Sequence, residues 1–212
     1  MKSKKTIAAT TAAALTLAAE IAYSQSVQQT SEMIDFNTGA AERGGGVLTR
    51  SADAVYVRLS TMDLDKKAAY SAWWVVFNEP WNCLTPWQCG EPDIVAGGVL
   101  NEVQIQAAKI SVFYADGFVT GTDGTANIAT HLESGPLPEN TFVNFGWGPG
   151  LGPPNGLIAG NGLIAEMHLV IRTHGKAVAG SVGLQTSTFT GLCDVQTCAD
   201  QQAIVFQSTE AP

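Results

Sequence analysis

The chain has 212 residues and a formal net charge of −8, and 45% of its residues are hydrophobic. This length suits one domain with a substantial core. An acidic chain is repelled by nucleic acid and by anionic lipid, and no cluster of basic residues downstream of the N-terminus offsets the charge. We therefore expect no nucleic-acid partner.

The N-terminus has the plan of a secretory signal peptide. Lysines at three of the first five positions precede an Ala/Thr/Leu-rich stretch over residues 6–22, and Ala22-Tyr23-Ser24 resembles a small-residue cleavage site. The alternative is a membrane anchor, but the apolar stretch is short, rich in threonine and contains Glu20. We predict that residues 1–24 are a signal peptide, that the mature protein is secreted or periplasmic, and that no membrane span remains after cleavage.

The four cysteines form two close pairs, Cys83 with Cys89 and Cys193 with Cys198. In an exported chain an even number of cysteines indicates disulfides, and three connectivities are possible. We favour the two local pairings, each of which would pin a loop. A zinc site of four thiolates is the alternative, although the gaps within the pairs are longer than the usual spacing of zinc ligands.

Most of the remaining chain shows either the alternation of strands or the composition of turns. Residues 25–50 are polar and contain three consecutive glycines, so we predict a loose N-terminal segment with at most one edge strand, at Val47-Leu48. Residues 99–108 fit either a short helix or a strand. Strands are predicted over residues 54–60, 69–78, 110–119, 126–132, 163–173 and 203–207.

These elements predict the fold class. The strand over residues 69–78 is apolar on both faces, so we expect it to lie centrally in a sheet. The pattern as a whole predicts an all-β fold, an antiparallel sandwich or barrel of about seven to eight strands with disulfide-stapled loops. We expect residues 51–212 to form a single β domain.

The most informative segment is residues 165–174, which alternates between an apolar face and a polar face. The polar face carries Glu166, His168, Arg172 and His174. Glu166 and His168 are roughly 6.6 Å apart along a strand, whereas roughly 20 Å separates His168 from His174. The four side chains therefore cannot act as one cluster. Glu166, His168 and Arg172 are the candidate catalytic residues, with His168 as acid–base group and Glu166 as its orienting partner.

A metal site on this face would need Glu166, His168 and a residue from a neighbouring strand, such as His131. Zinc or copper would suit these ligands. The sequence specifies no cofactor.

The structural alternative needs no ligand. In it, Glu166 pairs with a cross-strand arginine such as Arg58, and His168 forms hydrogen bonds within a polar layer. Arg172 and His174 then approach solvent at the end of the strand.

Trp147 is a candidate for ligand binding because it lies in a long Gly/Pro-rich loop over residues 135–162. Loops of this length are often functional, and a loop tryptophan can form a stacking surface. Such tryptophans more often close the open end of a sandwich. Tyr56 and Arg58 are the polar residues of a strand that could neighbour the histidine strand, and they complete the ligand-binding candidates.

Three segments carry a resemblance to a known family. Tyr70–Pro80, which Cys83 and Cys89 follow, Asp116–Gly124 and Glu166–Gly175 resemble segments of exported bacterial proteins with a β-rich fold. The resemblance spans most of the mature chain, implies export and a β-rich fold, and transfers no catalytic role to any residue. A fainter likeness is to chordin-type domains, which also have a histidine-bearing strand, but their short His-x-His motif is missing from this chain.

These observations predict a secreted or periplasmic protein that acts as a non-catalytic binding or envelope-associated module, with a small molecule or an envelope component as partner. The alternative is an enzyme, such as a lyase, cyclase or hydrolase, or a metal-binding protein, that uses the strand face of Glu166 and His168. The sequence contains no phosphate-binding loop, no Gly-x-Ser-x-Gly elbow and no His-Glu-x-x-His motif.

Overall fold

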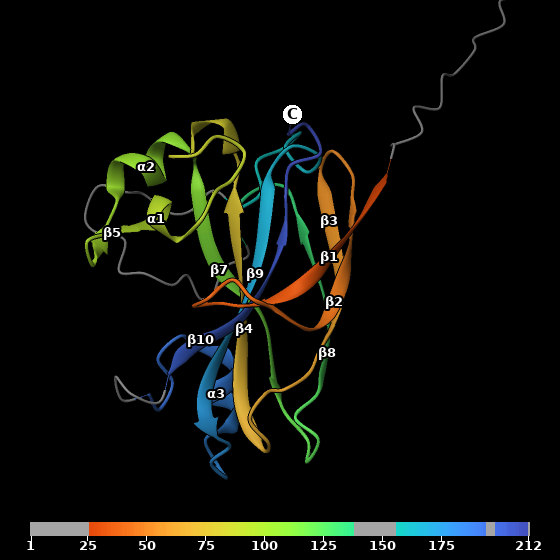
Figure 1. The fold of residues 1–212 in the computed structure, drawn as a ribbon, viewed down its shortest axis with the longest axis vertical. Coiled ribbons are helices and arrows are strands. Elements are labelled where there is room, and N and C mark those ends of the chain that lie inside the picture. Colours follow the sequence, from red (N-terminus) through yellow and green to blue (C-terminus); the bar gives the residue numbers. More distant parts are fainter. Residues whose placement is uncertain (1–25, 138–155, 194–197, 212) are drawn as a thin grey trace, which may run out of the picture.

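The computed structural model describes residues 26–137, 156–193 and 198–211, and its main element is one eight-stranded antiparallel sheet that curls into a nearly closed barrel (Figure 1). The strand order is β7-β4-β9-β10-β1-β2-β3-β8. The strands are β1 (Val27–Asp35), β2 (Ala41–Arg50), β3 (Ala54–Thr61), β4 (Ala68–Phe77), β7 (Ile110–Val119), β8 (Ala126–Glu133), β9 (Glu166–Lys176) and β10 (Ala199–Phe206). The all-β prediction is confirmed.

Short elements lie outside this sheet. A 3-10 turn (Pro80–Asn82), α1 (Glu91–Ile94), the two-stranded sheet of β5 (Val95–Ala96) and β6 (Val99–Leu100), and α2 (Glu102–Ala107) follow β4, and α3 (Val182–Ser187) follows β9. The sequence of residues 99–108 fits either a short helix or a strand, and in the structure most of this segment is helical. Asn101 caps α2, since its side chain accepts a hydrogen bond from the backbone N–H of Gln104. Among the described residues, no helix is long and apolar enough to cross a bilayer.

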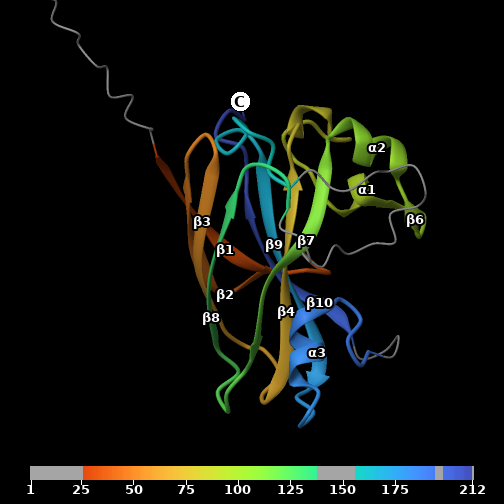
Figure 2. The same ribbon diagram turned by 180° about the vertical axis from the view of Figure 1, so that it is seen from behind.

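The two edges of the sheet approach each other, which makes the sheet nearly a barrel. β7 and β8 lie at opposite ends of the strand order, yet the Thr130 hydroxyl on β8 donates to the Ala115 carbonyl on β7 at 3.2 Å. Figure 2 shows the two strands side by side on the near side of the molecule. Ala115 is also the extra residue of a bulge in β7.

The described residues form two apolar cores, one on each face of β4. Tyr70, Trp74 and Val76 point into the barrel, whereas Val75 and Phe77 point outward into a second core beneath the segment that carries α1 and α2. All ten residues of β4 are buried. The predicted central position of this strand is confirmed, because β4 lies between β7 and β9.

The prediction of a loose segment over residues 25–50 is wrong. Most of this segment forms β1 and β2, and these strands join β10 to β3 within the barrel. The glycines that suggested a loop allow close packing of strands: a Cβ atom on Gly46 would lie 2.8 Å from the Cβ atom of Leu59. The β domain consequently begins at β1 and not at residue 51.

Arg50, the last residue of β2, is completely buried and connects three parts of the barrel. Its Nε atom donates to the Gln29 side chain on β1 at 2.9 Å. Its other nitrogens donate to four backbone carbonyls before β9 and at the end of β10, those of Gly162, Ala165, Phe206 and Gln207. Burial lowers the pKa of Arg50 to about 10, so the side chain stays charged at neutral pH, and the charge of Glu166 opposes this lowering.

Substitution Arg50→Met should lower the free energy of unfolding by about 3–5 kcal/mol, because it leaves several buried carbonyls without a donor and removes a positive charge that interacts with buried Glu166. Urea denaturation measures this loss. The matched control is Arg43→Met, which removes an exposed ion pair with Asp63 and should leave the midpoint nearly unchanged. Equal losses for the two variants would contradict the role assigned to Arg50.

Candidate functional site

The outer face of β4, β7 and β9 is covered at both ends by segments that disulfides close. The upper cover contains α1, α2 and the Cys83–Cys89 disulfide, and the lower cover contains α3 and the Cys193–Cys198 disulfide (Figure 1). Both local pairings favoured from the sequence are confirmed, with Cα atoms 5.4 and 5.3 Å apart. The described part of the chain has no free cysteine, so a zinc site of four thiolates is not formed.

A cavity of about 160 Å³ lies on this face. Its wall is mainly apolar, and its polar side chains are His168, Glu91 and Asp200. The apolar lining comes from Phe36, Trp73, Val75, Phe77, Ile94, Val95, Val112, Val170 and Phe189. An apolar cavity of about 150 Å³ accommodates a benzene molecule, so this volume fits a single ring or a short branched chain.

His168 lines the cavity and is held by Glu166. The two residues lie on the same face of β9, and His168 Nε2 is 2.8 Å from Glu166 Oε1. A carboxylate only accepts hydrogen bonds, so Nε2 carries the proton and Nδ1 of the neutral ring is an acceptor. Within the described part of the chain, Nδ1 of His168 has no hydrogen-bond partner, and the side chain is 12% exposed. Nδ1 of His168 is therefore an oriented acceptor in the wall of the cavity, in addition to the carboxylates of Glu91 and Asp200.

Glu166 is almost completely buried, at 1% exposure, and its two carboxylate oxygens have different surroundings. Its Oε1 atom also accepts the backbone N–H of Cys89 at 3.2 Å, so the upper cover and β9 share this carboxylate. Its Oε2 atom is buried without a hydrogen-bond partner among the described residues. The positive charge of buried Arg50 lies near enough to interact with it. A buried carboxylate needs such compensation.

Arg172 does not join Glu166 and His168, although all three are on one face of β9. Its Nη1 atom binds Asp200 Oδ1 at 2.8 Å, its Nε atom donates to the Phe189 carbonyl at 3.1 Å, and its guanidinium lies 3.8 Å from the centre of the Phe189 ring. Phe189 and Asp200 both line the cavity. Arg172 therefore positions one wall of the cavity.

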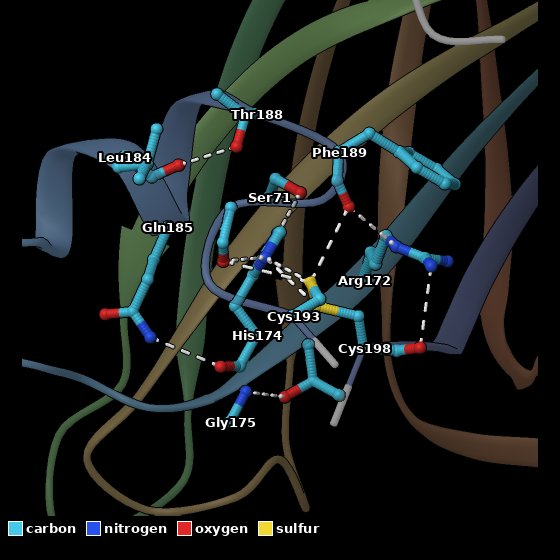
Figure 3. Close-up of a disulfide and its surroundings, with 12 residues drawn as sticks. Ser71, Arg172, His174, Gly175, Leu184, Gln185, Thr188, Phe189, Cys193 and Cys198 are labelled. Atoms are coloured by element: carbon cyan, nitrogen blue, oxygen red, sulfur yellow. Dashed lines mark hydrogen bonds between the residues drawn. A yellow bond between two sulfur atoms is a disulfide. The ribbon is translucent and has the colours of Figure 1, made fainter. Parts of the chain in front are cut away.

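His174 is buried at 3% exposure, so the expectation that it approaches solvent is wrong. The lower cover lies over the end of β9, and the histidine becomes part of a chain of hydrogen bonds (Figure 3). Trp73 Nε1 donates to Ser71 Oγ at 2.7 Å, Ser71 Oγ is 2.8 Å from His174 Nε2, and His174 Nδ1 is 3.2 Å from the Gly191 carbonyl. The carbonyl accepts only, so Nδ1 carries the proton and Nε2 accepts from the Ser71 hydroxyl.

The same histidine lies beside the lower disulfide. His174 Nδ1 is 3.3 Å from the sulfur of Cys193 and 3.3 Å from that of Cys198. In the described part of the chain, these are the three His, Cys, Asp or Glu residues that come close enough together to share a metal ion. Because the two sulfurs are joined, the group offers no thiolate in this oxidation state.

The other candidate residues lie away from the cavity. Tyr56 and Arg58 are on the outer face of β3, where the Arg58 Nε atom donates to the Tyr56 hydroxyl at 2.7 Å. The expected pair of Glu166 with Arg58 is not formed, because β10, β1 and β2 separate β9 from β3. His131 is exposed on β8, opposite Tyr56, and does not approach Glu166 or His168. Trp147 lies outside the described residues.

Most of the cavity wall could not be recognised in the sequence. Val75 and Phe77 carried a signal, since they alternate with inward residues on β4, but Phe36, Phe189 and Asp200 come from segments without a clear period. Arg50 was missed because one arginine after a run of glycines resembles a loop residue.

A scan against protein-family models finds none that matches this chain, and a search of the curated proteins finds no match either. The functional argument therefore depends on the geometry of the site.

His174 should make stability depend on pH. Burial, more than any other effect, lowers its pKa below 6.5, and Arg172 adds to the lowering, whereas the Gly191 carbonyl opposes it. As the pH falls through 6.5, the unfolded chain takes up a proton before the folded protein does. The free energy of unfolding then decreases by at most about 1.4 kcal/mol per pH unit for this one group.

The variant His174→Gln lacks this titration and isolates it. We expect the stability difference between the wild type and the variant to narrow on acidification from neutral pH, as measured by urea unfolding at several pH values. Carboxylates titrate in both proteins and cancel in the difference. A difference that stays constant with pH would show that His174 has no lowered pKa.

Proposed function

We propose that this protein is an exported binding module that holds a small, mainly apolar ligand in the cavity between its two covers. The observation that carries the proposal is the apolar cavity with a single oriented histidine acceptor, Nδ1 of His168. Ligand sites in proteins typically combine an apolar wall with a few placed polar groups. The volume limits the ligand, or the part of it that enters, to roughly the size of one six-membered ring.

The acceptor defines the polar group of the ligand. With its Nε2 proton committed to Glu166, neutral His168 accepts a hydrogen bond through Nδ1. A hydroxyl or an N–H on the ring would satisfy it. Glu91, which is exposed, also lines the cavity, and a carboxylate there disfavours anionic ligands.

Export is part of the proposal and is supported by two independent features. The first 24 residues have the plan of a signal peptide, and the two disulfides are of a kind that persists in oxidising compartments.

The variant pair that tests the cavity is Val170→Phe and Val103→Phe. Val170 lines the cavity, so the larger side chain should fill it, whereas Val103 on α2 is 80% exposed and serves as the matched control. With phenol as the probe, the wild type and the control should bind with a Kd on the order of 1 mM or lower, and Val170→Phe should not bind. Titration followed by NMR chemical shifts measures both affinity and location. Unchanged binding in Val170→Phe would contradict the proposal.

The polar contact is tested by comparing phenol with benzene. A hydrogen bond to Nδ1 of His168 should make phenol bind about five- to tenfold more tightly than benzene, and His168→Leu should abolish this preference while both probes still enter. If the wild type shows no preference, the histidine does not contact the ligand.

An acid–base enzyme is the second candidate, and the hydrogen bond between Glu166 and His168 is the observation that favours it. In such an enzyme Nδ1 of His168 would exchange a proton with the bound molecule. A natural ligand of the cavity that is converted during prolonged incubation with the wild type, but not with His168→Leu, would change the assignment from a binding module to an enzyme.

A further inference from the structure

The two disulfides have opposite surroundings. Cys83 and Cys89 are 5% and 8% exposed and belong to the second apolar core, whereas Cys193 and Cys198 are partly exposed at the surface of the lower cover. A small molecule in solution can therefore approach the lower disulfide more easily. Access is one of the factors that control the rate of exchange between a thiol and a disulfide.

The two disulfides also differ in the charges that surround them. A negative charge lies beside the upper disulfide, because the Glu166 carboxylate accepts the backbone N–H of Cys89 at 3.2 Å. A thiolate formed there would be disfavoured by the carboxylate. The lower disulfide lies beside His174, and the guanidinium of Arg172 reaches the carbonyl of Cys198 at 3.5 Å. A guanidinium charge and an imidazole N–H donor next to a cysteine both favour the thiolate.

The ring of His174 is oriented so that it can donate a hydrogen bond to a thiolate at the lower disulfide. Hydrogen bonds from Trp73 to Ser71 and from Ser71 to Nε2 fix the ring, so that its Nδ1–H group points toward the Gly191 carbonyl and the two sulfurs. Figure 3 shows Ser71 and the two cysteines beside the His174 ring. Both sulfur atoms lie 3.3 Å from Nδ1, so either one could accept this hydrogen bond on becoming a thiolate. No histidine or arginine takes this position at Cys83–Cys89 among the described residues.

We propose that Cys193–Cys198 is a thiol-exchanging disulfide which low-molecular-weight thiols open, and that Cys83–Cys89 is structural and does not exchange. In the first step, the thiolate of a small thiol attacks one sulfur, the Cys193–Cys198 bond breaks, and the other cysteine leaves as a thiolate that accepts the Nδ1–H of His174. In the second step, another small thiolate attacks the mixed disulfide. The small thiols leave as their disulfide, oxidised by two electrons, and their two protons end on Cys193 and Cys198.

Opening and closing of this disulfide would change the affinity of the cavity for its ligand. The disulfide closes the segment between Phe189 and Asp200, and both of these residues line the cavity. Opening it lengthens the unconstrained chain at that wall, so the oxidised form should bind ligand more tightly. This consequence rests on the proposed binding function, whereas the exchange itself can be measured without any ligand.

The exchange experiment uses the oxidised mature protein with dithiothreitol at neutral pH. EDTA is present to prevent metal ions from binding the freed thiolates. Samples are quenched with N-ethylmaleimide, and peptide mass spectrometry follows each cysteine separately. Cys193 and Cys198 should be labelled at least about tenfold faster than Cys83 and Cys89 in the same molecule. Equal rates, or faster labelling of Cys83 and Cys89, would overturn the proposal.

The role of His174 is tested with His174→Gln against His131→Gln, since His131 is exposed on β8 and far from both disulfides in the strand order. We expect His174→Gln to slow the reduction of Cys193–Cys198 at least about fivefold, and His131→Gln to have no effect. Faster labelling of all four cysteines in His174→Gln would indicate unfolding. In that case Ser71→Ala, which keeps the imidazole but removes the Nε2 partner, provides the test, and an unchanged rate in it would exclude a role for this oriented ring.

The regulatory consequence is measured with phenol binding to the wild type and to the double variant Cys193→Ser, Cys198→Ser. The variant should bind phenol at least about threefold more weakly, because the wall at Phe189 is no longer closed. Equal affinities would overturn the regulation but not the exchange. If phenol binds neither protein, the proposed binding function fails and the exchange result stands by itself.

Discussion

The structure depends on the burial of two opposite charges, Arg50 and Glu166, which make no direct contact but interact electrostatically. Arg50 donates hydrogen bonds to carbonyls before β9 and at the end of β10, so it ties the end of β2 to two strands that are not its direct neighbours in the sheet order. Glu166 begins β9, points to the other side of the sheet and binds both His168 and the upper cover. Each charge is costly to bury, and the hydrogen bonds that each group makes offset that cost together with their mutual attraction. The end of the barrel and the candidate site are therefore physically coupled.

This coupling explains why an outward face of a barrel strand holds a site. The outer face of β9 would be wet in a bare barrel, but the two covers bury most of it and leave a cavity between them. His168 lies in that cavity, and His174 lies beneath the lower cover next to a disulfide. One strand thus presents two histidines in two separate environments, one at an apolar cavity and the other at a pair of sulfurs.

Several features could be predicted from local pattern. The alternation over residues 165–174 assigned the inward and outward faces of β9, and the two-sided apolar character of residues 69–78 placed β4 inside the sheet. The close spacing of the cysteines favoured the pairing that is observed. β1 and β2 were not predicted, because Gly45 and Gly46 have no side chains to alternate and instead allow neighbouring strands to approach closely.

The sequence by itself determined the strands other than β1 and β2, the two faces of β9 and the separation of His168 from His174, because each follows from spacing along one extended segment, and the close spacing of the cysteines favoured the observed pairs. Only the tertiary structure decided that Glu166 pairs with His168 and not with Arg58, that His174 is buried, and that Phe189 and Asp200 form a wall with Arg172. These relations depend on strand order and on how the covers fold back. Strand order and the position of the covers are set by contacts between segments that are distant in the chain, and a local hydrophobic period does not predict such contacts.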